Sequence, residues 1–138
     1  MLASVDLDPD ADAIQASAAV NGRLVGATEE EVIAAVATVH ATLEHPVLRR
    51  AAASAMKGKI RRETPVLLTL DDGSLVEGVV DLAFREDSDE FSGWTVVDFK
   101  TDREFVAASE RYSAQVSVYS AAIQAATGVP SRGILLII

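Results

Sequence analysis

Two acids and a lysine stand at the ends of two apolar, strand-like segments of the sequence. Asp98 and Lys100 close a run that begins at Trp94, and Asp81 closes another that begins at Gly78. Because side chains in a strand alternate between two faces, Asp98 and Lys100 are expected on one face. Two carboxylates can hold a hard divalent cation, and a nearby ammonium can stabilise the charge that develops when a phosphodiester is cleaved. The pattern therefore predicts metal-dependent phosphodiester hydrolysis.

The same residues also have a simpler structural interpretation. Asp81 and Asp98 could be solvent-exposed acids at strand ends, and Lys100 could be a surface cation paired with Asp98 or Asp102. Exposed ion pairs of this kind contribute only about 0–1 kcal/mol and are common. The joint occurrence of the two acids with the lysine favours the metal site.

The second half of the chain has the periodicity of strands. Three strands are expected, over 66–70, 75–84 and 94–100. The first two flank an Asp-Gly turn at 71–74, which is typical of a β-hairpin. If consecutive strands are antiparallel, Asp81 and Asp98 lie on adjacent strands, where facing residues have Cβ atoms about 4.5–5.5 Å apart. That spacing suits one bridging cation.

A helix and a further strand are expected after the third strand. Apolar and small residues recur at helical spacing over 104–127, and Gly128 is placed to end that helix. Residues 133–138 are apolar apart from the opening glycine, which is typical of a strand buried on both faces.

The first half of the chain has the pattern of helices. Three are expected, over 8–19, 29–43 and 47–56. The pair Asn21-Gly22 is expected to close the first helix, and Thr28 with Glu31 matches a capping box at the start of the second. The fold class is therefore α/β, with a central mixed sheet flanked by helices. A helical part, 1–60, precedes a β-β-β-α-β core, 61–138, in one domain.

Composition narrows the class of protein. The chain has 138 residues, of which 49% are hydrophobic, and this suits one compact domain with a core. Cysteine is absent, which excludes disulfides, thiolate zinc sites and cysteine-ligated iron–sulfur clusters. No basic leader and no apolar run of about 18 residues is present, so we expect a cytoplasmic protein with no membrane partner.

The charge balance is acidic. A formal net charge of −9 disfavours unaided binding to the DNA backbone. Basic residues nevertheless cluster at Arg49-Arg50 and over 57–62, so a local groove could still be positive.

Three motifs occur in an order that resembles a known family. They are Gly78-Val79-Val80-Asp81-Leu82, Val96-Val97-Asp98-Phe99-Lys100-Thr101-Asp102, and Tyr112-x-x-Gln115-x-x-x-Tyr119. From about Arg62 onward the chain resembles the nuclease domain of RecB and AddA, which belongs to the PD-(D/E)XK superfamily. The resemblance implies a restriction-endonuclease-like fold and a magnesium-dependent deoxyribonuclease, usually joined to a helicase that processes double-strand DNA ends.

The resemblance also implies roles for individual residues. Asp81 and Asp98 would ligate Mg²⁺, or Mn²⁺ in its place, with help from the backbone carbonyl of Phe99. Lys100 would orient or help deprotonate the attacking water. Glu63 matches an acid that often precedes the first strand of this family, where either a catalytic function or a structural partnership would account for it.

The helix motif of the family would bring further residues to the site. Tyr112, Gln115 and Tyr119 stand along one helical stripe and could touch DNA near the scissile bond. The rings could equally pack in the core, which leaves Gln115 as the better functional candidate.

One metal ligand of the family has no counterpart in the motifs. It is a histidine on a helix near the start of the domain. His40 lacks the glycine that usually precedes this histidine, and neither His40 nor His45 is assigned the role. Residues 1–7 resemble the tail of that helix, so we expect the chain to begin just after it.

The expected function is DNA phosphodiester hydrolysis by an exonuclease-like module, with DNA and helicase domains as partners. The alternative is a catalytically inactive nuclease-like scaffold, or a DNA-end-binding module, within a larger repair protein. A metal ion between Asp81 and Asp98 would favour the enzyme, whereas a salt bridge from Lys100 that fills this space would favour the scaffold. An iron–sulfur nuclease is disfavoured because the chain has no cysteine.

Overall fold

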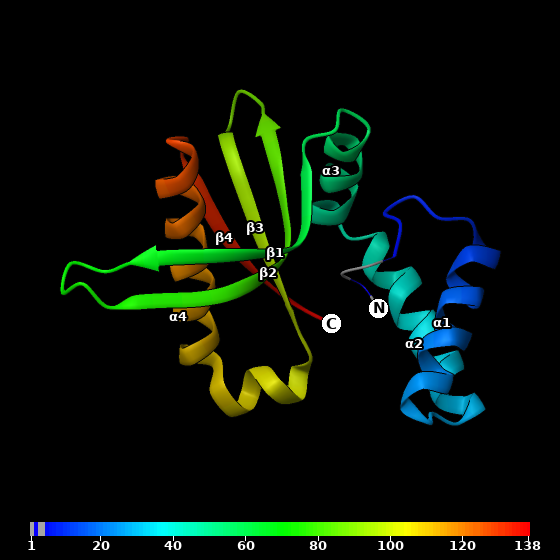
Figure 1. The fold of residues 1–138 in the computed structure, drawn as a ribbon. Helices are drawn as coiled ribbons and strands as arrows, with labels where there is room; N and C mark the ends of the chain where they lie inside the picture. Colours follow the sequence, from blue (N-terminus) through cyan, green and yellow to red (C-terminus); the bar gives the residue numbers. More distant parts are fainter. Residues whose placement is uncertain (1, 3–4) are drawn as a thin grey trace. The chain divides into compact units, whose positions relative to one another are not determined.

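The computed structural model describes Leu2 and residues 5–138 and has an α/β fold (Figure 1). Among the described residues, three helices in the N-terminal half precede a mixed four-stranded sheet, and the order β-β-β-α-β is confirmed. The chain forms two compact units, Met1–Ala53 and Ser54–Ile138.

Within the described part of the chain, none of the helices combines the length and apolar character that a membrane span requires. The expectation that residues 1–7 form the tail of a helix falls partly on residues 1, 3 and 4, which lie outside the described residues.

The first unit is helical. Its helices are α1 (Ala11–Val25), α2 (Glu29–Leu43) and most of α3 (Pro46–Ala55). The predicted capping box at the start of α2 is confirmed, because Thr28 Oγ1 accepts from the Glu31 amide and the Glu31 carboxylate accepts from the Thr28 amide.

The predicted end of the first helix is wrong, because α1 continues through Asn21 and Gly22 to Val25. Gly22 is buried against α2, and a Cβ at this position would lie 2.5 Å from Val32 Cγ2. The glycine therefore permits close packing of the two helices. Gly26, with φ 70°, ends the helix in the left-handed conformation that glycine adopts without strain.

The second unit contains the sheet. Its elements are β1 (Ile60–Thr69), β2 (Leu75–Asp87), β3 (Ser92–Lys100), α4 (Asp102–Thr127) and β4 (Ser131–Ile137). The strand order is β1-β2-β3-β4, with antiparallel pairing along β1, β2 and β3 and parallel pairing of β4 with β3. The long helix α4 packs against β1, β3 and β4 (Figure 1).

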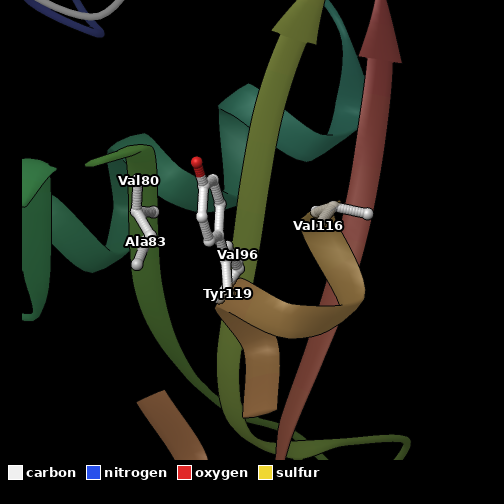
Figure 2. Close-up of a cluster of buried hydrophobic side chains, with 5 residues drawn as sticks. All are labelled: Val80, Ala83, Val96, Val116 and Tyr119. Atoms are coloured by element: carbon white, nitrogen blue, oxygen red, sulfur yellow. The ribbon is translucent and has the colours of Figure 1, made fainter. Parts of the chain in front are cut away.

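Side chains from the sheet and from α4 meet in a hydrophobic cluster (Figure 2). Its members are Val80, Ala83, Val96, Val116 and Tyr119. Gly78 makes room for the Tyr119 ring, because a Cβ at position 78 would overlap the ring. The cluster fixes α4 on the face of the sheet that carries Val96. Asp98 and Lys100 belong to the same face by strand alternation.

A polar chain links three strands of the sheet. Arg132 of β4 forms an ion pair with Glu86 of β2 at 2.8 Å. The Arg132 Nε donates to Thr95 Oγ1 of β3 at 3.1 Å, and Thr95 in turn donates to Glu86. These contacts satisfy the buried Glu86 carboxylate, and they hold β4 in its parallel register.

The prediction that the last strand is buried on both faces is wrong. Among residues 131–137 only Leu136 is buried, and Gly133 is exposed. The reason is topological, since β4 is the last strand in the sheet order and pairs on one side only with β3. An apolar run therefore marked an edge strand partly covered by α4.

Candidate functional site

Asp81 of β2 and Asp98 of β3 meet at the end of the ladder that joins their strands. The register pairs Leu82 with Val97, so the two aspartates follow as the next positions on each strand. Asp81 Oδ2 accepts a hydrogen bond from the Phe99 amide at 3.0 Å, which anchors the Asp81 carboxylate to β3. Asp98 is only 3% exposed.

Burial and the nearby Asp98 affect the ionisation of Asp81. Burial raises the pKa of Asp81, the Phe99 hydrogen bond lowers it, and the negative charge and side-chain contact of Asp98 raise it further. The net direction is upward. Like charges at short range disfavour the ionised form, so this pair attracts a positive charge.

Lys100 supplies one positive charge. Its Nζ lies 2.7 Å from Asp98 Oδ2, and both side chains are largely buried. Burial acts to lower the pKa of Lys100, but the Asp98 carboxylate, followed by the charges of Asp81 and Glu104, raises it above its usual value. The ammonium is therefore held in its protonated form among three acids.

One oxygen of the site has the Lys100 ammonium as its partner. Asp98 Oδ2 is buried and lies 2.7 Å from Lys100 Nζ. A buried carboxylate oxygen usually has a hydrogen-bond donor or a cation as a partner. Asp98 Oδ2 has such a cation in the Lys100 ammonium, so a metal ion at this oxygen would share it with Lys100 or displace the ammonium.

The donor set fits a hard divalent cation. Carboxylate oxygens are the ligands that Mg²⁺ and Mn²⁺ prefer, and Mg²⁺ is commonly bound by one or two carboxylates with the remaining positions taken by water and phosphate. Among the described residues, no group of three or more histidines and acids is placed to hold a metal. A cation would therefore depend on Asp81 and Asp98, with the Phe99 carbonyl as the predicted third ligand.

The helix motif faces the sheet. The Tyr112 ring lies against Lys100, with Nζ 4.8 Å from the ring centroid. Gln115 Nε2 donates to the Tyr119 hydroxyl at 2.7 Å, and Tyr119 packs in the core cluster. The structure thus connects Tyr112 to the acids through Lys100, whereas Gln115 and Tyr119 interact with each other.

No known family model matches the sequence. No curated protein matches it either. The resemblance to the RecB and AddA nuclease domain therefore stays a prediction that depends on the three motifs.

The remaining candidates are Glu63, His40 and His45, and none of them takes part in the contacts described above. Glu63 is exposed in β1 and adopts φ 43°, between the pairs that Arg62 and Thr64 form with β2. His40 and His45 lie in the first unit. His40 is exposed on α2, and His45 Nδ1 accepts from the Val47 amide at 3.2 Å in the first turn of α3.

Two supporting features were absent from the sequence-based predictions. Thr101 caps α4 directly after Lys100 and forms a second capping box with Glu104. The Thr-x-x-Glu spacing could have revealed it. Ala108 has non-helical angles, φ −154° and ψ 41°, and kinks α4 before Tyr112. No glycine or proline marks this kink, so the sequence held no signal for it.

Proposed function

We propose that this protein hydrolyses phosphodiester bonds of DNA with the help of a divalent metal ion. Asp81 and Asp98 would hold the cation, with the Phe99 carbonyl as the ligand that the resemblance implies, and Lys100 would stabilise the scissile phosphate and orient the attacking water. The single observation that carries the proposal is the convergence of the two aspartates with the Lys100 ammonium, which lies 2.7 Å from Asp98.

The metal ion, the two aspartates and the lysine would each have a separate role in hydrolysis. A bound Mg²⁺ or Mn²⁺ would supply a Lewis acid and lower the pKa of a coordinated water. The buried Asp98 and half-buried Asp81 provide the negative charge that retains this cation. Lys100 keeps its proton next to these acids, so it presents a fixed positive charge to a phosphate.

The wider context is also a proposal. The order of the three motifs supports an exonuclease-like module of a helicase–nuclease that processes double-strand breaks. DNA and the helicase domains of a parent polypeptide or complex would be its partners. The resemblance is the support for this part, and the site geometry has no bearing on it.

Degradation of linear DNA in Mn²⁺ tests the activity. Asp98→Asn keeps the size of the side chain but weakens metal binding, so we expect a loss of rate of at least about 100-fold, because removal of even an outer-shell partner of a metal ligand costs about 10–100-fold. Lys100→Met is expected to lose about 10²–10³-fold, as when one preorganised charge stabiliser is removed. Asp89→Asn, which changes an exposed acid in the loop before β3, serves as the matched control. Equal degradation by the wild type and Asp98→Asn would refute the proposal.

A second candidate is a nuclease-like scaffold without catalysis. The ion pair between Lys100 and Asp98 favours it, because a lysine that neutralises a buried aspartate can serve structure alone. In that case Lys100→Met would lower stability by several kcal/mol, about 3–5 for a broken buried pair, while the wild type would show no metal-dependent DNA degradation.

A further inference from the structure

Two positively charged side chains, those of Lys100 and Arg111, lie against the ring of Tyr112. Lys100 Nζ lies 4.8 Å from the ring centroid, and Arg111 Cζ lies 5.3 Å from it. Both distances fall within the range of cation–π attraction. The ring therefore holds two positive charges close together, although their mutual repulsion opposes this arrangement.

The kink in α4 sets this arrangement. Thr101 starts the helix directly after Lys100, and the non-helical Ala108 redirects the chain before Tyr112. Figure 1 shows the bend near the start of α4. Tyr112 consequently returns to the end of β3 and packs on Lys100. Its ring is half-buried and Arg111 is exposed, so the cations extend from the buried acids toward solvent.

The two cations differ in their surroundings. Lys100 is neutralised by Asp98, with further attraction from Asp81 and Glu104. Arg111 presents an exposed guanidinium, whose planar donors match the oxygens of a phosphate in bidentate geometry. An anion next to Lys100 therefore has a second anion-binding group beside it.

A nucleic-acid strand has the matching charge pattern, because every nucleotide contributes a phosphate. We propose that Arg111 binds the phosphate adjacent to the scissile one, so this site binds a polynucleotide strand more tightly than a small phosphodiester with a single phosphate. This inference rests on the proposed function for the position of the scissile phosphate. Tyr112 acts as a positioning residue, since its ring holds Lys100 and Arg111 and does not itself need to contact a base.

The salt dependence of strand binding tests the role of Arg111. Fluorescence anisotropy with a labelled single-stranded oligothymidylate, in Ca²⁺ and at increasing salt, gives the slope of log affinity against log salt. One phosphate contact contributes about 0.7 to this slope for a single strand. We expect Arg111→Gln to reduce the slope by about 0.7, and Arg111→Lys to retain it. Tyr112→Phe should retain the slope because the ring remains, whereas Tyr112→Leu should reduce it.

Arg23→Gln is the matched control, because Arg23 is an exposed arginine in the last turn of another helix, α1. It should leave the slope unchanged. An unchanged slope in Arg111→Gln, a fall in Arg23→Gln equal to that in Arg111→Gln, or a wild type without strand affinity would overturn the inference.

A separate reaction distinguishes this outcome from failure of the proposed function. Bis(4-nitrophenyl) phosphate has one phosphodiester and no neighbouring phosphate, so its Mn²⁺-dependent hydrolysis by the wild type and Asp98→Asn reports on the metal centre alone. If hydrolysis is absent but Arg111→Gln still reduces the salt slope, Arg111 binds a phosphate of the strand, while the catalytic proposal fails and with it the position of this phosphate next to a scissile one. If hydrolysis depends on Asp98 but the slope does not depend on Arg111, the centre stands and the subsite is refuted.

Discussion

Asp81 and Asp98 place two acids in a partly buried position, where the charge of Asp98, together with burial, disfavours ionisation of Asp81. Proteins retain such pairs when a cation or a function compensates for the cost. Lys100 compensates one of the two acids directly, through its contact with Asp98. The pair is therefore expected to lower stability in the absence of metal and to contribute affinity in its presence.

The stability of an Asp81→Asn variant tests this cost. Burial, with the charge of Asp98, raises the pKa of Asp81 in the folded protein, so the folded state binds this proton more tightly than the unfolded chain does. Stability therefore falls as pH rises through the window between the unfolded and the folded pKa. Asn keeps an oxygen acceptor for the Phe99 amide and removes the charge. In metal-free buffer at pH 7 we expect the variant to melt a few degrees higher, about 2–8 °C for 1 kcal/mol.

The gain should shrink as the pH falls through this window and disappear below the unfolded pKa of about 3.9, where both states bind the proton. Asp72→Asn provides a control of opposite sign. Hydrogen bonds from Ser74 lower the pKa of Asp72 in the hairpin turn, so this carboxylate stabilises the protein above its unfolded pKa. A lower melting temperature for Asp81→Asn at pH 7 would contradict the expected cost of the pair.

The sequence predicted which residues share a face of one strand better than it predicted contacts between separate elements. Strand alternation correctly placed Asp98 and Lys100 together, because period-2 geometry is local. The Phe99 hydrogen bond to Asp81 and the Tyr112 contact with Lys100 depend on how separate elements pack. Such contacts have no signature in residue spacing.

At the scale of elements, two capping boxes of the same type allow a matched comparison. Thr28 begins α2 and Thr101 begins α4, and each accepts from the amide three residues on. Replacing either threonine with alanine should cost about 1 kcal/mol of stability. Thr101→Ala should also weaken Mn²⁺ binding, because Thr101 fixes the chain directly after Lys100.

Thermal melts and calorimetric Mn²⁺ titrations of both variants measure these effects. Equal losses of Mn²⁺ affinity in Thr28→Ala and Thr101→Ala would show that general destabilisation explains the change.

The contact between β2 and α4 depends on Gly78, which has no side chain. A Cβ at Gly78 would overlap the ring of Tyr119, which is 6% exposed and held in the core. Gly78→Ala should therefore destabilise the protein by about 1–3 kcal/mol, as overpacking does. The added Tyr119→Leu change should recover part of this loss, because it removes the ring that the new methyl group meets. Additive effects of the two changes in chemical denaturation would exclude a clash between them.

Elements with strong local signals were predicted well, and elements defined by packing were not. The α2 helix has both a capping box and an apolar period, and its predicted range, 29–43, is confirmed. Gly22 has the same local signal as a helix end, but its contact with Val32 on α2 decides its role. The burial of β4 likewise depends on its place in the sheet, which an apolar run alone cannot specify.

For the whole molecule, the net charge of −9 opposes DNA binding at long range. A divalent cation at Asp81 and Asp98 would remove local negative charge next to Lys100 and Arg111. We therefore expect Ca²⁺, which takes oxygen ligands as Mg²⁺ does, to raise the affinity for linear DNA by at least about 10-fold at low salt.

Anisotropy titrations with and without Ca²⁺ measure this change, and Asp98→Asn should abolish most of it. A Ca²⁺ effect of the same size in Asp98→Asn would mean that the cation acts elsewhere on the protein or the DNA.

The α/β class and the strand order along the chain followed from the change of period at about residue 60. The one-domain organisation stays a prediction, and the two compact units divide at Ala53 and Ser54, near the expected change from a helical part, 1–60, to a core, 61–138. The predicted nuclease activity and the predicted site residues both come from three short motifs. The rest of the chain contributed little to either prediction.

Calorimetric titration of the wild-type chain and Asp98→Ala with Mn²⁺ tests the central claim most directly. If Asp81 and Asp98 share a divalent cation, the wild type binds one Mn²⁺ and Asp98→Ala loses this binding, while both chains keep the same far-ultraviolet circular dichroism. Equal Mn²⁺ binding by the two folded chains, or none by the wild type, would contradict the claim.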